Sequence, residues 1–469
     1  MSFFKRYCWL LLGCGLILLT RLAFVLKGPL HFDSDQAIMG LMASDIAEGK
    51  SFPFYFWGQR YLMALESWWV APFFWFFGAT ITTLKFPLLL LNLFTYLILY
   101  ESLVRSKEAS FKDAFLILLP LTSTSVVLSS RLVEAQGANI EPLLYVSILW
   151  LIRTHPFLLG ALSGIFFVHR EFSLYPLVAL LICHYLFSEN SLKKKLTFYF
   201  LVFVTFVSGV VLLKSLGNQL TPIGIEVTSK TLSFGKPLKC FWNVISDTLP
   251  AFFGFESHSY REFNLLSDIS ALPVAVRWLG ILFLFGIILK SFYLLKKSRL
   301  SFFKQHPLPF YWLLTGGLAL MAYVFISPGD DLMTFRYQLV GIYFFLGLFA
   351  LVFHTQLRTQ VLCVLICFAL LNSARAIELA WEQFSHPPHD EYSELAEALA
   401  HQHLTIGWGD YWVSYYLTFA SKKSLFFATK NSRTPDWEKI IEISPERKVT
   451  IQKEPCTNGN KVVKWYLCN

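Results

Sequence analysis

The residues best suited to chemistry lie at 31–36, in the run His31-Phe32-Asp33-Ser34-Asp35-Gln36, directly after an apolar stretch. Asp33 and Asp35 place two carboxylates two residues apart. An aspartate beside a cavity can act as a general base, or can orient the group that does. Two solvated loop acids would leave the same pattern, so the pair alone assigns no reaction.

Other charged side chains also lie at or near the ends of apolar runs. They are Arg60, Glu66, Arg131, Glu134, His169, Arg170, Glu171, Asp330, Asp331 and Arg336. A charge near hydrocarbon is costly unless it is paired or faces water. If the runs cross a membrane and these ends share one face, the charges line a polar cavity there. Carboxylates that activate a hydroxyl and arginines that hold a phosphate would suit transfer of a group from a lipid phosphate.

The composition indicates that the apolar runs are membrane spans. Of the 469 residues, 55% are hydrophobic and only 15% are charged, whereas soluble domains carry roughly 25% charged residues. A water-soluble globule could not cover 47 Phe and 14 Trp without large exposed apolar patches. The net charge of +9 comes from Lys and Arg scattered through short loops. Because no long basic stripe is present, we expect no nucleic-acid partner.

About 20 apolar residues cross a bilayer, and eleven runs, several of them short, are candidate spans. They are 7–26, 84–100, 114–128, 140–152, 157–168, 174–187, 196–213, 274–289, 310–326, 339–353 and 361–371. The run 59–78 is also apolar, but Arg60, Glu66 and three tryptophans are typical of a helix lying at the interface. With that choice the basic clusters all fall on the N-terminal side, as the positive-inside rule requires.

The expected fold is therefore a mainly α, polytopic membrane bundle over 1–375 and a small extracytoplasmic α/β domain over 376–469. Its outer side receives the first loop, 27–83, and a large aromatic loop, 214–273, which would cover the site or form an interfacial belt. In the tail we expect helices at 391–400 and 411–419 and strands near 403–407, 425–429, 448–452 and 462–467. Cys456 and Cys468 flank a predicted hairpin, and in an oxidising compartment they should form a disulfide, with two free thiols as the alternative.

The sequence shows no local cluster of His, Cys and carboxylate residues with metal-binding spacing. Most of the eight cysteines lie in apolar runs, where a thiol behaves as a small hydrophobe. We therefore expect no cofactor and no tightly held metal, with a carboxylate-bound divalent cation as the alternative.

Several runs resemble the bacterial GT-C glycosyltransferases of the protein-mannosyltransferase and aminoarabinose-transferase superfamily. The similar residues are Asp35 to Ala43, Gly58-Gln59-Arg60-Tyr61-Leu62 with Glu66, Phe77-Gly78, Arg336-Tyr337, and Gly409-Asp410-Tyr411-Trp412. The likeness spans most of the chain, and the first loop is its most distinctive part.

The resemblance implies that Asp35 is the base that deprotonates the acceptor. Gln36 stands where that family commonly has a second acid, so we expect Asp33 to supply the helper carboxylate. A polyprenyl-phosphate sugar donor, inversion at the anomeric carbon, and a lipid, glycan or protein acceptor are also implied. The active site and tail would face the periplasm from the bacterial inner membrane, among membrane lipids.

The departing phosphate needs cations where negative charge develops. We expect these to be Arg336, Arg170, Arg60 and His169. Substrate contacts are expected from Glu66, Gln59, Tyr61, Tyr337 and Arg131.

Two other functions fit the same charged cavity. A transporter or flippase of a lipid-linked substrate would use it without chemistry, and a non-catalytic envelope-assembly subunit would only bind there. Transporters usually show paired halves and broken helices at the midplane, whereas here the charges gather on one face. That asymmetry favours an enzyme.

Overall fold

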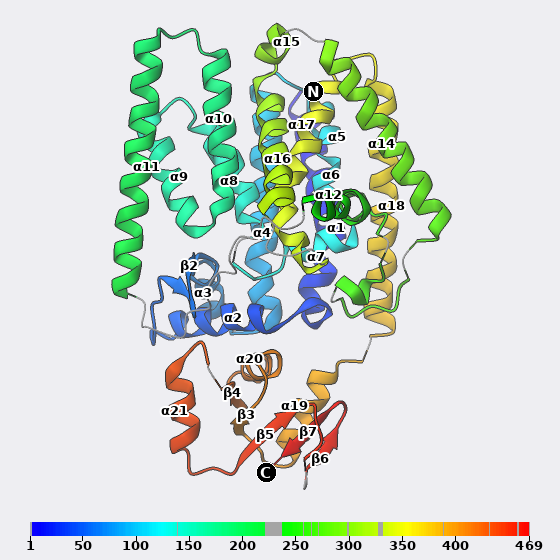
Figure 1. Cartoon of the computed structure of the whole chain (residues 1–469). Helices are drawn as coiled ribbons and strands as arrows, with labels where there is room; N and C mark the ends of the chain where they lie inside the picture. The colour runs from blue at the N-terminus through cyan, green and yellow to red at the C-terminus, as the bar shows by residue number, and fades with distance from the viewer. Residues whose placement is uncertain are drawn as a thin grey trace.

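The computed structural model describes residues 2–468 apart from 138, 221–236, 257, 264, 271, 298–299, 327–331, 388, 431 and 457–458. The chain forms a helical bundle followed by a small mixed sheet (Figure 1). The N-terminus and α15 (Leu300–Gln305) lie at one end of the bundle, and the C-terminal domain lies at the opposite end (Figure 1). These are called the N-terminal end and the tail end below.

Seven helical segments in the described part of the chain are long and apolar enough to cross a membrane. They are α1 (Ser2–Leu26), α4 (Ile81–Arg105), α11 (Leu192–Leu220), α14 (Val274–Lys297), α16 (Pro307–Ile326), Phe335–Val352, and α18 (Arg358–Ser385). The segment Phe335–Val352 consists of most of η5 (Leu332–Gly341) and all of α17 (Ile342–Val352). These are the helices of a multi-pass membrane protein, as the composition predicts.

The remaining four predicted spans are shorter or broken. Three become the apolar helices α8 (Glu141–Leu151), α9 (Pro156–His169) and α10 (Leu174–Phe187). The run 114–128 falls within α5 (Phe111–Ile117), α6 (Leu119–Thr122) and α7 (Val126–Leu132). Two local causes explain the breaks. Pro120 has no N–H to continue a helix, and Ser125 caps α7 by accepting a hydrogen bond from the Leu128 amide at 3.1 Å.

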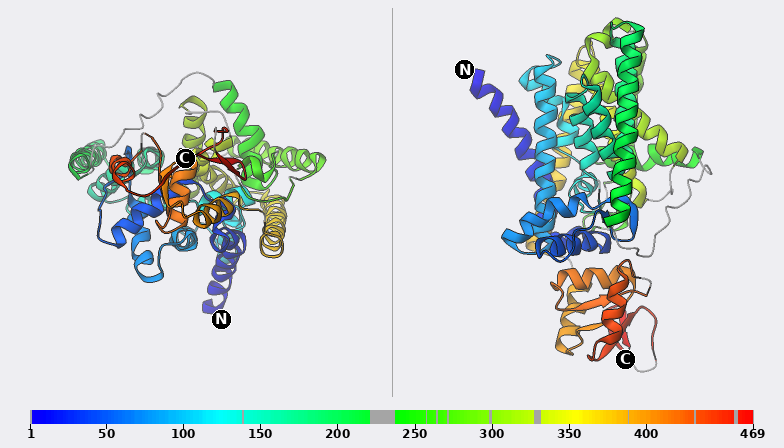
Figure 2. Two further views of the ribbon diagram at one scale, coloured as in Figure 1. Left: turned by 90° about the horizontal axis from the view of Figure 1, so that it is seen from below. Right: turned by 90° about the vertical axis from the view of Figure 1, so that its left-hand side faces the viewer.

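The first loop lies across the tail end of the bundle and does not cross it (Figure 2). After η1 (Gly28–His31) it forms α2 (Ser34–Ala47), an antiparallel pair of β1 (Tyr55–Phe56) and β2 (Gln59–Met63), and α3 (Leu65–Phe77). The run 59–78 thus makes a strand and a 13-residue helix, which is too short to span a bilayer. Trp68, Trp69 and Trp75 on α3 remain exposed, as suits an interfacial helix.

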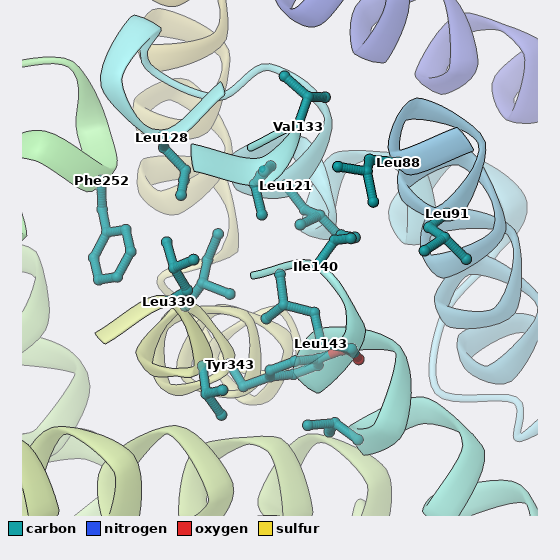
Figure 3. Close-up of a cluster of buried hydrophobic side chains, with 14 of the residues drawn as sticks. Leu88, Leu91, Leu121, Leu128, Val133, Ile140, Leu143, Phe252, Leu339 and Tyr343 are labelled. Carbon is teal, nitrogen blue, oxygen red and sulfur yellow. Dashed lines mark hydrogen bonds between the residues drawn. The ribbon is translucent and has the colours of Figure 1, made fainter. Parts of the chain in front are cut away.

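The large loop contributes to the bundle core. It contains α12 (Pro237–Asn243), the π-helical turn η3 (Val244–Thr248), α13 (Leu249–Phe253) and η4 (Tyr260–Phe263). Phe252 and Phe253 are buried, and Phe252 points into the same cluster as Leu128 and Leu339 (Figure 3). These two aromatic rings therefore neither cover the site nor form an interfacial belt.

The C-terminal domain is a mixed α/β unit, as predicted. It comprises α19 (Glu391–His401), β3 (Ile406–Trp408), α20 (Tyr411–Ala420), β4 (Phe426–Ala428), α21 (Pro435–Ile443), β5 (Lys448–Gln452), β6 (Asn460–Val462) and β7 (Trp465–Cys468). The sheet order is β4-β3-β5-β7-β6. β3 pairs in parallel with β4 and β5, and β7 pairs antiparallel with β5 and β6. The sequence missed α21 and merged β6 with β7, while the predicted Cys456–Cys468 disulfide is confirmed.

This domain packs on α2 through its helix α20. Phe32, just before α2, contacts the rings of Tyr416 and Phe419, at centroid distances of 5.1 and 5.7 Å. The Ser34 hydroxyl donates to the Trp412 carbonyl at 2.8 Å. Gly40 permits this close approach, because a Cβ atom there would overlap the Phe419 ring.

We expect Gly40→Ala to loosen the contact between α2 and α20, since overpacking a buried contact costs about 1–3 kcal/mol. Thermal unfolding of the purified protein in detergent should show a lower Tm. Gly15→Ala in α1 is the matched control, because a Cβ there meets nothing within 4 Å. An unchanged Tm for Gly40→Ala would contradict the tight packing.

Candidate active site

Asp33 has a positioning role at the start of α2. Its Oδ1 caps the helix by accepting from the Gln36 amide at 3.0 Å. Its Oδ2 accepts a hydrogen bond from Gln136 Nε2 at 2.6 Å, and the side-chain oxygen Oε1 of Gln136 accepts one from Arg336 Nη1. The pKa of Asp33 is raised to about 7, mainly because the carboxyl is buried and also because the negative charges of Asp35 and Glu134 lie nearby.

Asp35 lies in the first turn of α2, and its side chain is 20% exposed. Its Oδ1 accepts a hydrogen bond from the Tyr411 hydroxyl and lies 3.4 Å from Arg433 Nη2. Both partners belong to the C-terminal domain. Because both contacts go to Oδ1, Oδ2 has no hydrogen-bond partner within the described residues. The membrane bundle and the tail thus share one carboxylate between them.

Arg336 approaches this carboxylate pair from the bundle, and Arg170 lies beside it against the same Tyr337 ring. Arg336 stacks on the Tyr337 ring at 5.2 Å, and Arg170 lies over the Phe172 ring at 5.2 Å and the Tyr337 ring at 5.9 Å. Arg336 interacts electrostatically with Asp35 and Glu134. The aromatic rings hold the two guanidinium planes and leave N–H groups for another acceptor.

Among the buried guanidinium nitrogens that have no hydrogen-bond partner in the described part of the chain, three belong to arginines of this site: Arg170 Nε, Arg336 Nε and Arg433 Nη1. A buried donor without a partner is costly, and native structures seldom retain one without a reason. Tyr61 on β2 lies within electrostatic range of Arg170, Arg433 and Asp35, and burial raises its pKa. The site can therefore hold an anion against arginines beside a carboxylate.

Beneath the site, a buried ion-pair network fixes the chain where α7 meets the first loop. Glu134 Oε1 lies 3.0 Å from His31 Nε2 and accepts from Arg131 Nη1 at 2.7 Å. Asn139 donates to Glu134 Oε2 at 2.8 Å. Burial raises the pKa of Glu134, but the charges of Arg131 and His31 outweigh it and hold that pKa well below its ordinary value. Arg131, expected from the sequence to contact substrate, forms this buried pair.

The other predicted site residues lie in separate surroundings. Buried Glu66 accepts from the Gly137 amide at 2.7 Å and neighbours the Glu141 carboxyl. His169 Nδ1 is 2.7 Å from the Tyr145 hydroxyl. Arg60 lies within electrostatic range of Tyr55, and Gln59 pairs with Phe56 across β1 and β2. Asp330 and Asp331 lie outside the described residues.

Tyr411, Arg433 and Gln136 were absent from the predicted site. Tyr411 had a signal, because it lies in the run 409–412 that carries part of the family resemblance. Arg433 lies just before the unpredicted helix α21, and no local pattern links it to a residue 398 positions earlier.

No protein-family model matches this chain, and a search of curated proteins gives no match either. The family membership implied by the sequence motifs therefore stays a prediction. The assignment of function below depends on the geometry of the site and on those motifs.

The raised pKa of Asp33 predicts a pH-dependent stability. Its unfolded pKa is about 3.9, so between that value and about 7 the folded chain binds one more proton than the unfolded chain. Stability should therefore fall as the pH rises through this window, by at most about 4 kcal/mol, and level off above it.

Thermal unfolding of the wild type and of Asp33→Asn at pH 5, 6, 7 and 8 tests this. The variant cannot ionise at this position and should lose less stability with rising pH. Asp436→Asn, at an exposed site, should keep the wild-type slope. Identical slopes for wild type and Asp33→Asn would refute the raised pKa.

Proposed function

We propose that this chain is a membrane glycosyltransferase that moves a sugar from a polyprenyl-phosphate donor to an acceptor hydroxyl on the outer face of the bacterial inner membrane. The acceptor is a lipid, an envelope glycan or a protein. Asp35 is the base, and Arg336, Arg170 and Arg433 hold the phosphate. Asp33 positions the helix that carries Asp35.

One observation carries this proposal: buried guanidinium N–H groups without partners gather beside a partly exposed carboxylate. Arg131 and Glu134 balance each other in the network beneath. Arg170, Arg336 and Arg433 then bring three positive charges near Asp35 and the partly protonated Asp33, and Arg336 also interacts with Glu134. The excess positive charge favours a dianionic or monoanionic phosphate as the missing partner.

The proposed reaction depends on which oxygen atom of Asp35 already accepts hydrogen bonds. Tyr411 and Arg433 hold Asp35 through Oδ1, so Oδ2 can take the proton from an acceptor hydroxyl. As that proton moves, the acceptor oxygen bonds to the anomeric carbon and the carbon–oxygen bond to phosphate breaks. Attack from the side opposite the leaving group inverts the anomeric carbon. The polyprenyl phosphate departs with the electron pair, and the guanidinium groups stabilise the charge that develops on it.

The arrangement of charge supports a site at the outer membrane surface. Arg170 follows α9, and Arg336 lies in η5, both near ends of apolar segments. The basic segments 105–112, 193–195, 290–297 and 300–304 fall near the N-terminal end of the bundle (Figure 1). If α5–α7, α8, α9 and α10 cross as well as the seven long helices, the chain makes eleven crossings, and the positive-inside rule then supports an external tail.

Asp35→Asn should lower transfer by about 10²–10⁴-fold, because an amide cannot take the proton. The assay is transfer from synthetic polyprenyl-phosphate sugars by the purified chain in detergent, with the donor sugar chosen by mass spectrometry of envelope glycans from a deletion strain. Arg336→Lys and Arg170→Lys should each lower kcat by about 10²–10³-fold. Asp33→Asn should be milder than Asp35→Asn.

Asp45→Asn is the matched control. Asp45 also lies on α2 and also pairs with the C-terminal domain, through Lys423 at 2.6 Å. It lies near the far end of α2 from Asp35 and its arginine partners. It should keep full activity. Full loss from Asp33→Asn with normal activity for Asp35→Asn would reverse the two roles. Flipping of a lipid-linked substrate without any product would favour the transporter.

The eleven-crossing path predicts an external C-terminus. Alkaline phosphatase fused after Asn469 should be active, since this enzyme needs an oxidising compartment to form its disulfides. If only a cytoplasmic reporter is active at that position, the eleven-crossing path is wrong and the site does not lie on the outer face of the membrane.

A further inference from the structure

A second group of polar side chains lies at the N-terminal end of the bundle, opposite the proposed active site. Glu108 follows α4, His306 lies between α15 and α16, and His354 follows α17. His306 Nδ1 is 2.8 Å from Glu108 Oε2, and His354 Nε2 is 3.8 Å from the same oxygen. Within the described residues this is the group of three in which His, Cys, Asp or Glu ligand atoms all lie within 4.8 Å of one another.

The charge on Glu108 is not balanced by a lysine or arginine among the described residues. Its side chain is only 2% exposed, and its ionic contacts are the two imidazoles. Neighbouring Arg358 is instead paired with Asp113 at 2.6 Å. A buried carboxylate needs a compensating cation.

The two histidines are poorly arranged to supply that charge together. Their rings stack with centroids 3.8 Å apart and an interplanar angle of 20°. Two imidazolium ions stacked at this distance would repel each other. With both rings neutral, His306 Nδ1 and His354 Nε2, the nitrogens nearest Glu108 Oε2, can carry the lone pairs, and a metal ion would replace the proton of the 2.8 Å hydrogen bond between His306 and Glu108.

We propose that Glu108, His306 and His354 bind one divalent transition-metal ion of the zinc class. Two imidazole nitrogens and one carboxylate oxygen are a usual donor set for Zn²⁺, with water completing a tetrahedron. Ligand atoms around such an ion lie about 3.4 Å apart, given metal–ligand distances of about 2.0–2.1 Å. The 3.8 Å contact already suits this spacing, while the 2.8 Å hydrogen bond opens by about 0.6 Å on binding.

The ion would join three connections that are distant in sequence: α4 to α5, α15 to α16, and α17 to α18. Metal binding to a folded site stabilises the folded state by linkage. Its role is therefore to fix the N-terminal end of the bundle, independently of any sugar transfer at the other end.

The test uses the untagged full chain in detergent, stripped with a chelator and titrated with Co²⁺ as an optical probe. We expect one equivalent to bind with the intense visible absorption of a tetrahedral site, and Zn²⁺ to displace it. Zn²⁺ should also raise the Tm. His354→Ala should weaken Co²⁺ binding by at least about 100-fold, because even second-shell changes around metals cost about 10–100-fold.

His354 is the chosen position because its side chain is 27% exposed, so its loss should leave the metal-free fold intact. An equal Tm of the metal-free variant and wild type checks this. Glu108→Gln provides a second variant, and His155→Ala is the control, since His155 is an exposed histidine between α8 and α9. Absence of stoichiometric Co²⁺ binding, or equal binding by wild type and His354→Ala, overturns the proposal.

Discussion

The central constraint on this molecule is the cost of placing charges at the end of an apolar bundle. At the tail end the constraint is met first by Glu134, which is buried against Arg131 and His31. Lys85 on α4 adds hydrogen bonds to the carbonyls of Gly28 and His31. These contacts fix η1 and therefore the point where α2 begins. Without them the two carboxylates of the first loop would have no defined position.

On that base the site is assembled from both parts of the chain. The bundle supplies Arg170 and Arg336, which lie over the rings of Phe172 and Tyr337. The C-terminal domain supplies Tyr411 and Arg433 to Asp35, and its packing on α2 brings them there. The domain is therefore part of the candidate active site and more than an appendage to the membrane region.

The two ends of the bundle balance buried charge in different ways. At the tail end, three arginines lie near Asp33 and Asp35, and Arg170 Nε, Arg336 Nε and Arg433 Nη1 have no hydrogen-bond partner among the described residues. At the opposite end, a buried carboxylate meets two stacked imidazoles. The first imbalance favours an anionic ligand and the second a cationic one. Each proposal thus supplies a partner of opposite charge for a buried polar cluster.

The sequence by itself determined the membrane class, most helices and strands of the tail, the Cys456–Cys468 disulfide, and Asp35 as a residue of interest. Composition and hydrophobic runs are properties of the sequence alone, so they can be recognised without knowing which residues are in tertiary contact. Only the tertiary structure decided that Arg131 pairs with Glu134, that Arg433 reaches Asp35, and that Glu108, His306 and His354 meet. Arg131 and Glu134 lie only three residues apart, but their burial against His31 depends on packing, and the other contacts join residues that lie far apart in the chain. No local pattern encodes such packing.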